Sequence, residues 1–438
     1  MAARALGLGP LSGTVEAEVE SLAHGGEGVA HVDGRVVFVP GAAPGDRVLA
    51  RIVEEHPRWA RARLEEILRP SADRIVPRCP LHAECGGCGL QHVPPHVQRR
   101  AKARAVADLL ERVGGRRPAA PIVCEAAPRE WAYRQRAVLS WRRAEEGIVV
   151  GFHRAGDPVA LVDVPACPVL DERISARLPD VRSALIGALG DEGPAANEGR
   201  LALRALPGHE VDAGVFAADP GPTRRIAGAL AARGLPATWG RWDRTGLRLA
   251  DGAPRREVRL TYRDLNLRVG FDSFLQADLE AAAALYKAAL EMLDTAPGEA
   301  AIDAYAGIGV LACELARSGA RVTAVESHPG AASDLRANVA WAGGDVHVLE
   351  IAADRLDWRR PRPDAIVVNP PRGGCTRRVI EGIARSGARR LIYVACDPAT
   401  LARDVRRLGA GWRLDRVRAF DLFPQTAHVE TILRLTRT

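Results

Sequence analysis

The spacing of apolar positions divides the chain into three parts, and the first is a series of short strands. From Thr14 to Leu68, runs of alternating apolar and polar residues such as TVEAEVESL and RVVFVP are separated by the turn signals GGEG and PGAAPGD. Five short strands within about 70 residues are typical of a small closed barrel. We therefore expect an OB-like β-barrel domain over residues 1–70.

The middle part, residues 71–262, has a less regular pattern. It begins with a cysteine-rich segment, and an amphipathic pattern with a basic first turn then predicts a helix over residues 96–113. The later segments VVGFHRA and PVALVDVP predict strands. Residues 172–262 mix helical and strand-like runs, and the pattern does not define their order. We expect a β-rich central domain here.

In the third part, residues 263–438, apolar strands alternate with amphipathic helices, which predicts a parallel sheet. The segments AAIDAYAG, RVTAVES, DAIVVNP and RLIYVAC predict strands, and GVLACELARSG and PGAASDLRANVAWAG predict helices. The expected fold class is α/β, with a Rossmann-like domain preceded by the barrel and the central domain.

The charge of the chain favours an anionic partner. Its net charge of +7 and pI of about 9.2 are typical of proteins that bind nucleic acid. However, Lys occurs only at Lys102 and Lys287 among 61 basic residues, and a GC-rich coding bias gives the same excess of arginine. Near the end of the barrel, Arg58, Trp59 and Arg61 fit either an RNA surface or a solvated strand face.

No long uncharged apolar stretch and no secretory signal is present, so we expect a cytoplasmic protein without a membrane span. Nothing in the pattern indicates an obligate protein partner.

A nucleoside-binding turn is predicted where the first strand of the third part ends. The segment Asp303-Ala-Tyr-Ala-Gly307-Ile-Gly309 follows that strand and opens a helix, and small residues there let a cofactor approach the backbone. Glu326 ends the next strand, where an acid can accept hydrogen bonds from both ribose hydroxyls. The turn lacks a full G-x-G-x-x-G, so a cradle for phosphates is less favoured than a site for S-adenosylmethionine.

Cys396, at the end of another apolar strand, is a candidate nucleophile. A thiolate there could add to C6 of a uracil ring and turn C5 into a carbon that accepts a methyl group. A base must afterwards remove the C5 proton, and Glu430 in FPQTAHVE is the candidate. The alternatives are a buried inert thiol for Cys396, a surface acid for Glu430 and a neutral structural imidazole for His428.

The motif Asn369-Pro370-Pro371-Arg372 ends a further strand in a rigid turn that points a polar side chain into the same cleft. Amino-group methyltransferases place an aromatic residue after the prolines, and RNA cytosine-5 methyltransferases a cysteine. Arg372 stands at that position, which argues against both.

The spacing Cys79-x5-Cys85-x2-Cys88 indicates a metal site, because close thiolates on a glycine turn can surround one centre. Cys167, between two prolines, is the best fourth ligand, and Cys124 is its competitor. Four thiolates suit zinc or a 4Fe-4S cluster, and ligand identity alone does not decide between them.

Together these motifs resemble the S-adenosylmethionine-dependent RNA (uracil-5-)-methyltransferases, specifically the 23S rRNA branch that has a TRAM domain and an iron–sulfur cluster. GEGVAHVDGRVVFVPGAAPGDRV is similar to the TRAM domain, RCPLHAECGGCGLQH to the cluster segment, and YVACDPATLARD and LFPQTAHVET to the catalytic segments. The resemblance implies a class I methyltransferase domain and an RNA substrate, most readily 23S rRNA, with tRNA as the alternative.

The resemblance also implies roles for particular residues. A 4Fe-4S cluster would be bound by Cys79, Cys85, Cys88 and Cys167, with a structural role because the chemistry requires no electrons. Cys396 would be the nucleophile and Glu430 the base. The cofactor S-adenosylmethionine would contact Gln276 in FDSFLQAD, Tyr305, Gly307, Glu326 and Asn369.

The chain departs from the family pattern at several positions. The family usually has Asp-Pro-Pro-Arg and Ser-Cys-Asn-Pro, whereas this chain has Asn369 and Asp397, and we hypothesise that these two changes compensate each other. Val310 and Ala352 stand where polar cofactor contacts are usual, which predicts altered cofactor affinity.

Three other classes of protein share some of these features. An RNA cytosine-5 methyltransferase uses the same addition chemistry but lacks support at Arg372. A non-catalytic, metal-stabilised RNA-binding protein explains the charge and the cysteines but not Cys396 with Glu430. A TRAM-bearing radical enzyme would carry C-x3-C-x2-C, which the chain lacks.

Overall fold

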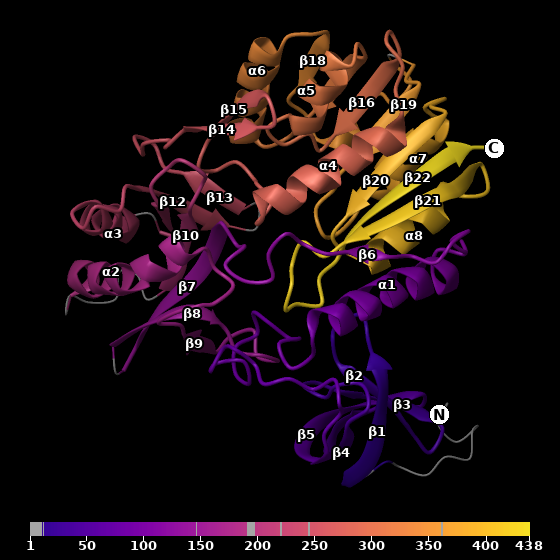
Figure 1. Ribbon diagram of the computed structural model, residues 1–438. Coiled ribbons are helices and arrows are strands. Elements are labelled where there is room, and N and C mark those ends of the chain that lie inside the picture. Colours follow the sequence, from indigo (N-terminus) through magenta and orange to yellow (C-terminus); the bar gives the residue numbers. More distant parts are fainter. Residues whose placement is uncertain are drawn as a thin grey trace.

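The computed structural model describes residues 11, 13–145, 147–190, 198–219, 221–243, 246–360 and 362–438. Within them the chain forms a closed barrel, a seven-stranded sheet, a two-stranded hairpin and an eight-stranded sheet. Figure 1 shows the barrel at one end of the molecule, below α1, and the two large sheets side by side above it. The expected α/β fold with an N-terminal barrel is confirmed.

The barrel closes in the order β1-β2-β3-β5-β4 around alternating apolar positions such as Val19, Val37 and Ala50. Its strands are β1 (Thr14–Leu22), β2 (Gly28–Val32), β3 (Arg35–Val39), β4 (Arg47–Glu55) and β5 (Trp59–Arg69). Trp59 stacks on His56 with ring centroids 4.0 Å apart, and Arg61 pairs with Glu27. Because Trp59 and Arg61 already have partners within the barrel, they fit a solvated strand face better than an RNA surface with free cationic and aromatic groups.

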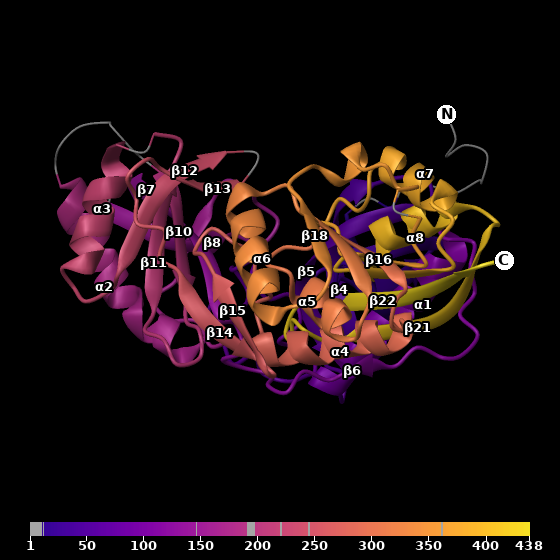
Figure 2. The ribbon, with the colours of Figure 1, turned by 90° about the horizontal axis from the view of Figure 1, so that it is seen from above.

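The seven-stranded sheet has the order β13-β12-β11-β10-β7-β8-β9. Helices α2 and α3 cover one of its faces (Figure 2) and bury side chains such as Leu139, Leu201 and Val215. The segment whose order the sequence pattern left undefined supplies β10 to β13 and both helices. Their bounds are β7 (Arg136–Ala144), β8 (Gly147–His153), β9 (Leu161–Asp163), α2 (Glu172–Leu189), β10 (Glu198–Arg204), β11 (Asp212–Ala217), α3 (Gly221–Ala231), β12 (Ala237–Asp243) and β13 (Gly246–Leu249).

The hairpin of β14 (Val258–Tyr262) and β15 (Leu265–Val269) leads into the eight-stranded sheet, ordered β18-β17-β16-β19-β20-β22-β21-β6. Every strand and helix predicted for this part is present. The elements are α4 (Leu279–Leu293), β16 (Ala300–Ala304), α5 (Val310–Arg317), β17 (Arg321–Val325), α6 (Pro329–Ala342), β18 (Val346–Leu349), η2 (Ala353–Arg355), β19 (Ala365–Val368), α7 (Arg377–Arg385), β20 (Arg390–Ala395), α8 (Pro398–Leu408), β21 (Trp412–Phe420) and β22 (Glu430–Arg437).

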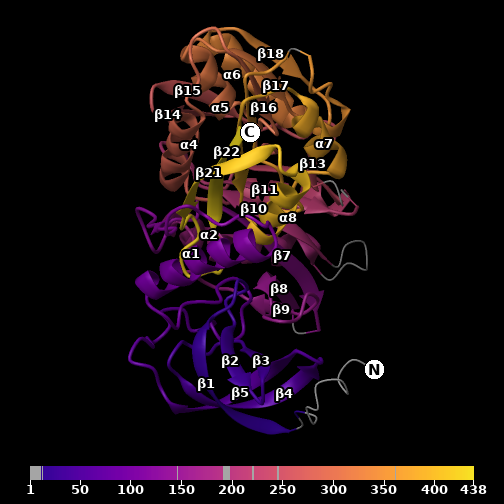
Figure 3. The same cartoon turned by 90° about the vertical axis from the view of Figure 1, so that its right-hand side faces the viewer.

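One segment from the middle of the sequence belongs spatially to this last sheet. Helix α1 (Pro95–Arg112) packs on α8 and lies between the barrel and the sheet (Figure 3). The short strand β6 (Cys124–Glu125) then pairs in parallel with the end of β21. The predicted domain limits at residues 70 and 262 stay predictions. Residues 95–125 fall within the predicted central domain in sequence, although they pack with the eight-stranded sheet.

None of the described helices combines the length and the apolar character that crossing a bilayer requires.

Candidate active site

The carboxyl ends of the parallel strands bring most of the predicted site residues to one edge of the sheet. Tyr305 follows β16, Glu326 follows β17, Asn369 follows β19 and Cys396 follows β20. Because ligands of open α/β sheets bind outside this edge, the arrangement is that of a cofactor and substrate site. Gln276 lies in the loop that precedes α4.

Cys396 and Glu430 meet through strand pairing. Strand β22 is antiparallel to β20 and pairs Thr431 with Ala395, which places Glu430 beside Cys396. Glu430 is 2% exposed, and burial raises the pKa of its carboxyl to about 7 although Arg372 opposes the shift. Burial, and next the Glu430 carboxylate, raise the pKa of the Cys396 thiol to about 11. The pair is therefore a thiol next to a weak carboxylic acid.

Arg372 supplies the positive charge of this group. It lowers the pKa of both Cys396 and Glu430, and its Nη2 atom lies 3.2 Å from Nε2 of His428. Burial of the ring and then Arg372 lower the pKa of His428 to about 4, although the residue as a whole reaches solvent. A neutral imidazole can accept the hydrogen bond from the guanidinium. From the sequence alone, Arg372 indicated only that amino-group methylation and cytosine-5 methylation are disfavoured.

The predicted nucleoside turn contains acceptors that the protein leaves available. Glu326 accepts hydrogen bonds from the backbone N–H of Gly307 (2.9 Å) and of His328 (2.6 Å), which leaves lone pairs on both oxygens. Asp303 is buried, and its Oδ2 has no hydrogen-bond partner among the described residues. Burial raises the pKa of Asp303 to about 7, and Glu326 adds to this shift.

The glycines of this turn are required by its shape. Gly309 has φ of 90°, and a Cβ atom there would lie 2.3 Å from Leu335 Cδ1. Gly307 has φ of 58° with nothing within 4 Å of its would-be Cβ, so there is open space beside its backbone. The donors and acceptors of the turn therefore border room for a ligand.

Gln276 and Tyr305 reach different parts of this site. The buried Gln276 bonds to the hydroxyl of Tyr286 on α4, whose pKa is raised by burial and then by Glu430. Tyr305 has a left-handed backbone (φ of 63°), and its hydroxyl contacts the thiol of Cys375. The structure thus connects Gln276 to the surroundings of Glu430 and sets Tyr305 at the strained start of the turn.

Asp397 has a local function. Its Oδ1 accepts a hydrogen bond of 2.8 Å from the backbone N–H of Thr400 and so caps α8. Asp and Asn are about equally good at this position, so the cap accounts for either residue here. Compensation between Asn369 and Asp397 stays a hypothesis.

The segment before Glu430 is held by residues from the first third of the chain. Gln98 of α1 donates from Nε2 to Gln425 Oε1 (3.0 Å) and accepts from the Gln425 backbone N–H (2.8 Å). Gln425 has φ of 71°, and the Tyr133 hydroxyl donates to the neighbouring Pro424 carbonyl. A strained residue persists only where its surroundings fix it, and here the reciprocal amide pair does so.

One turn further along α1, Lys102 forms a buried ion pair with Asp421 and also donates to the Phe423 carbonyl at 3.1 Å. Burial lowers the pKa of Lys102, while Asp421 raises it. The chain has arginine at nearly every other cationic position, so this compact, buried site is one of only two that hold lysine. This contrast between Lys102 and the arginine-rich remainder is visible in the sequence itself.

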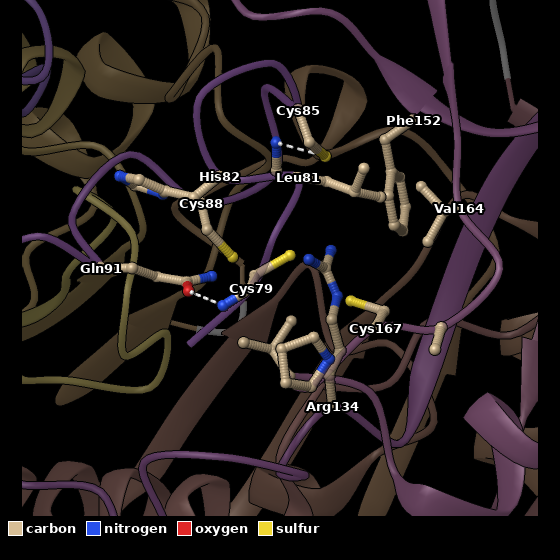
Figure 4. A pocket seen from close by; sticks show the side chains of 14 residues that line it. Cys79, Leu81, His82, Cys85, Cys88, Gln91, Arg134, Phe152, Val164 and Cys167 are labelled. Atoms are coloured by element: carbon tan, nitrogen blue, oxygen red, sulfur yellow. Dashed lines mark hydrogen bonds between the residues drawn. The ribbon is translucent and has the colours of Figure 1, made fainter. Parts of the chain in front are cut away.

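The four predicted ligand cysteines line one pocket. Figure 4 shows Cys79, Cys85, Cys88 and Cys167 together with the side chain of Arg134. Burial raises the pKa of the Cys88 thiol to about 12, and neighbouring thiols add to this shift. Cys124, the competing fourth ligand, lies instead in β6 within the core beside β21. Among the residues placed by the structure, no three His, Cys, Asp or Glu side chains are arranged to hold a single metal ion.

Comparison with known proteins assigns the class. The family model for tRNA (uracil-5-)-methyltransferases matches residues 239–438, and the TRAM domain model matches residues 13–64. The 23S rRNA (uracil(1939)-C(5))-methyltransferase RlmD of Alkalilimnicola ehrlichii is 33% identical over 95% of both chains. The RlmD protein of Thiobacillus denitrificans is also 33% identical, over 96% of this chain and 99% of its own.

A solved structure has the same fold. The tRNA (uracil-54, C5)-methyltransferase of Pyrococcus abyssi, in complex with S-adenosyl-L-homocysteine, covers 96% of this chain and all of its own with a TM-score of 0.73 and 23% identity. The fold and the relatives define an S-adenosylmethionine-dependent RNA methyltransferase. The chain belongs to the RNA (uracil-5-)-methyltransferase family.

We predict that Lys102→Met lowers the free energy of unfolding by about 3–5 kcal/mol, because it leaves the Asp421 carboxylate buried without its partner. Lys287→Met is the matched control, since Lys287 is exposed and its pair with Glu291 contributes less than about 0.5 kcal/mol. Denaturant unfolding of both variants measures the difference. Equal midpoints would show that the ion pair does not hold the segment before Glu430.

Proposed function

We propose that this enzyme transfers a methyl group from S-adenosylmethionine to C5 of a uridine in 23S rRNA. The observation that carries the proposal is the pairing of β20 with β22, which puts a thiol and a buried carboxyl side by side at the cofactor edge of the sheet. Alignment with RlmD relatives over nearly the whole chain supports rRNA, whereas the tRNA enzyme of known structure supports the shared fold.

Cys396 acts first in the proposed reaction. Its proton passes from Sγ to solvent, which the half-buried Cys396 can reach, and the guanidinium of Arg372 favours the resulting thiolate. The thiolate then forms a bond to C6 of the uracil ring, and the electron pair of the C5–C6 double bond moves toward C5 and O4. S-adenosylmethionine, when bound, supplies a methyl group on a sulfonium that this C5 carbon can attack.

Glu430 completes the reaction. Its carboxylate removes the proton from the methylated C5 carbon, the C5–C6 double bond re-forms, and the bond to Cys396 breaks to release the thiolate. A carboxyl group with a pKa of about 7 is a stronger base than an exposed glutamate and can lose its proton again at neutral pH. The target base must leave its stack to reach Cys396, because C5 and C6 are inaccessible within a helix.

The residues around the nucleoside turn fit S-adenosylmethionine. The free lone pairs of Glu326 suit two ribose hydroxyls, and Gly307 leaves room for the ligand beside its backbone. The unpartnered Oδ2 of Asp303 provides a further acceptor near that turn. We assign Gln276, Tyr305 and Asn369 to the same cofactor site.

We further propose that Cys79, Cys85, Cys88 and Cys167 bind a 4Fe-4S cluster of structural function. Four thiols from two separate segments line one pocket that has no carboxylate in its wall, which suits a cluster with thiolate ligands. The barrel and the face of the central sheet opposite α2 and α3 would bind RNA beside it. An rRNA substrate and eight unpaired cysteines also favour the cytoplasm.

Nucleoside mass spectrometry tests the substrate. Cells without the gene should lose 5-methyluridine from 23S rRNA and keep it in tRNA, and expression of the gene should restore it. Loss from the tRNA pool alone would identify the tRNA alternative, and loss from neither pool would refute the methylation of either RNA.

Two substitutions test the proposed chemistry. Cys396→Ser should abolish both methyl transfer and covalent capture of RNA, whereas Glu430→Gln should trap a methylated protein–RNA adduct that survives denaturing electrophoresis. In the wild-type enzyme, release should accelerate as the pH rises through about 7, because Glu430 must be ionised to act. Cys313→Ala, at a buried cysteine on α5, is the control and should retain activity. An adduct formed by Cys396→Ser would contradict the proposal.

Iron analysis tests the cluster. Cys167→Ala should lower the iron and sulfide content of the purified protein and its melting temperature, because one of four ligands is lost. Cys124→Ala, at the buried cysteine outside the pocket, should keep the wild-type iron content. The same iron content in both variants would rule out Cys167 as a ligand.

A further inference from the structure

A groove with five arginines lies outside the active site. Its walls are formed by residues 356–360 and by α7, which lies at the periphery of the molecule (Figure 3). The cationic side chains are those of Arg359, Arg360, Arg377, Arg378 and Arg385. Only two carboxylates, Asp357 and Glu381, line the same groove, so its net charge is positive.

The backbone of this groove is firmly built. Trp358 is 4% exposed and donates from Nε1 to the Ala353 carbonyl at 3.2 Å. Its ring lies against Gly382 of α7, where a Cβ atom would be only 2.2 Å from Trp358 Cδ1. The close packing of ring and glycine fixes the loop against the helix, so the neighbouring arginines are presented from a rigid base.

Three of the five arginines have no acidic partner within ion-pair distance among the described residues. Arg377 and Arg385 both pair with Glu381. Across the described part of the chain, the ion pairs include none to Arg359, Arg360 or Arg378, and all three side chains are exposed. Clustered like charges without counter-charges favour an anionic ligand.

The barrel differs in this respect. Its exposed Arg47, Arg51 and Arg61 pair with Glu16, Glu65 and Glu27. Arg359, Arg360 and Arg378 of the groove therefore differ from these three barrel arginines, each of which has an acidic partner.

The α7 wall of the groove follows the Arg372 turn closely in the sequence. Helix α7 begins after the turn that holds Arg372, which lies in electrostatic contact with Cys396 and Glu430. From Arg377 to Arg385 the helix extends about 12 Å, at about 1.5 Å per residue. A polyanion that enters the active site can thus continue along the arginines.

We propose that this groove binds the sugar–phosphate backbone of the substrate RNA next to the nucleotide held in the active site. The guanidinium group matches phosphate geometry with two parallel hydrogen bonds, and the exposed Arg359, Arg360 and Arg378 can present their donors to it. The proposal rests on the proposed function, because it takes RNA as the substrate.

The test measures RNA affinity at several salt concentrations with the full-length protein. The triple variant Arg359→Gln, Arg360→Gln and Arg378→Gln should lower the slope of log Kd against log salt by about 2, since each single-strand phosphate contact contributes about 0.7. Affinity near physiological salt should fall about tenfold or more. The kcat at saturating RNA should be unchanged, because Cys396 and Glu430 are untouched.

Two control variants separate phosphate contact from net charge and from misfolding. Replacement of the same three arginines by lysine should keep most of the slope, because an ammonium group also neutralises a phosphate. The triple variant Arg224→Gln, Arg225→Gln and Arg233→Gln, on the far side at α3, removes the same charge and should keep the wild-type slope.

A wild-type slope in the groove variant, or an equal loss in the α3 variant, would overturn the proposal. The proposed function fails in a different way: a wild-type enzyme that binds RNA but forms no 5-methyluridine would refute methylation and leave the groove assignment standing.

Discussion

The active site depends on the antiparallel pairing of β22 with β20. Every other strand that carries a site residue here is parallel, and its functional side chain lies at the end of its own strand. Only the reversed direction of β22 places the first residue of one strand, Glu430, beside the residue that follows the other, Cys396. A parallel last strand would put its first residue at the opposite edge of the sheet.

This constraint also explains why the two groups perturb each other. Burial at this edge of the sheet removes water from the Glu430 carboxyl and from the Cys396 thiol. The charged form of each group therefore becomes less favourable. The pKa of the acid rises to about 7 and that of the thiol to about 11. Arg372 stabilises both anions from the solvent side, which lets one exposed cation serve the buried Glu430 and the half-buried Cys396.

The sequence predicted this edge of the sheet because its signals are local. The strand ends at Asp303, Glu326 and Cys396 could be located from apolar runs and turn residues alone. Chemical reasoning proposed Glu430 and Cys167 as candidates while leaving alternatives open, and the family resemblance then implied their roles. The seven-stranded sheet could not be ordered, since its strands 136–144 and 198–204 pair across a long separation that no local pattern encodes.

The sequence pattern could not predict the long-range polar contacts for the same reason. These contacts join the cysteine pocket to the segment that leads into β22. The Cys79 backbone N–H donates to Gln91, and the Leu90 backbone N–H donates to the Gln425 carbonyl. Gln98 then binds both the 90–93 turn and Gln425. Because these groups are buried, their hydrogen bonds cannot be replaced by water without cost. A loosened cysteine segment would therefore release the loop that leads to Glu430, which gives this segment, although remote in sequence, a physical means to fix the position of Glu430.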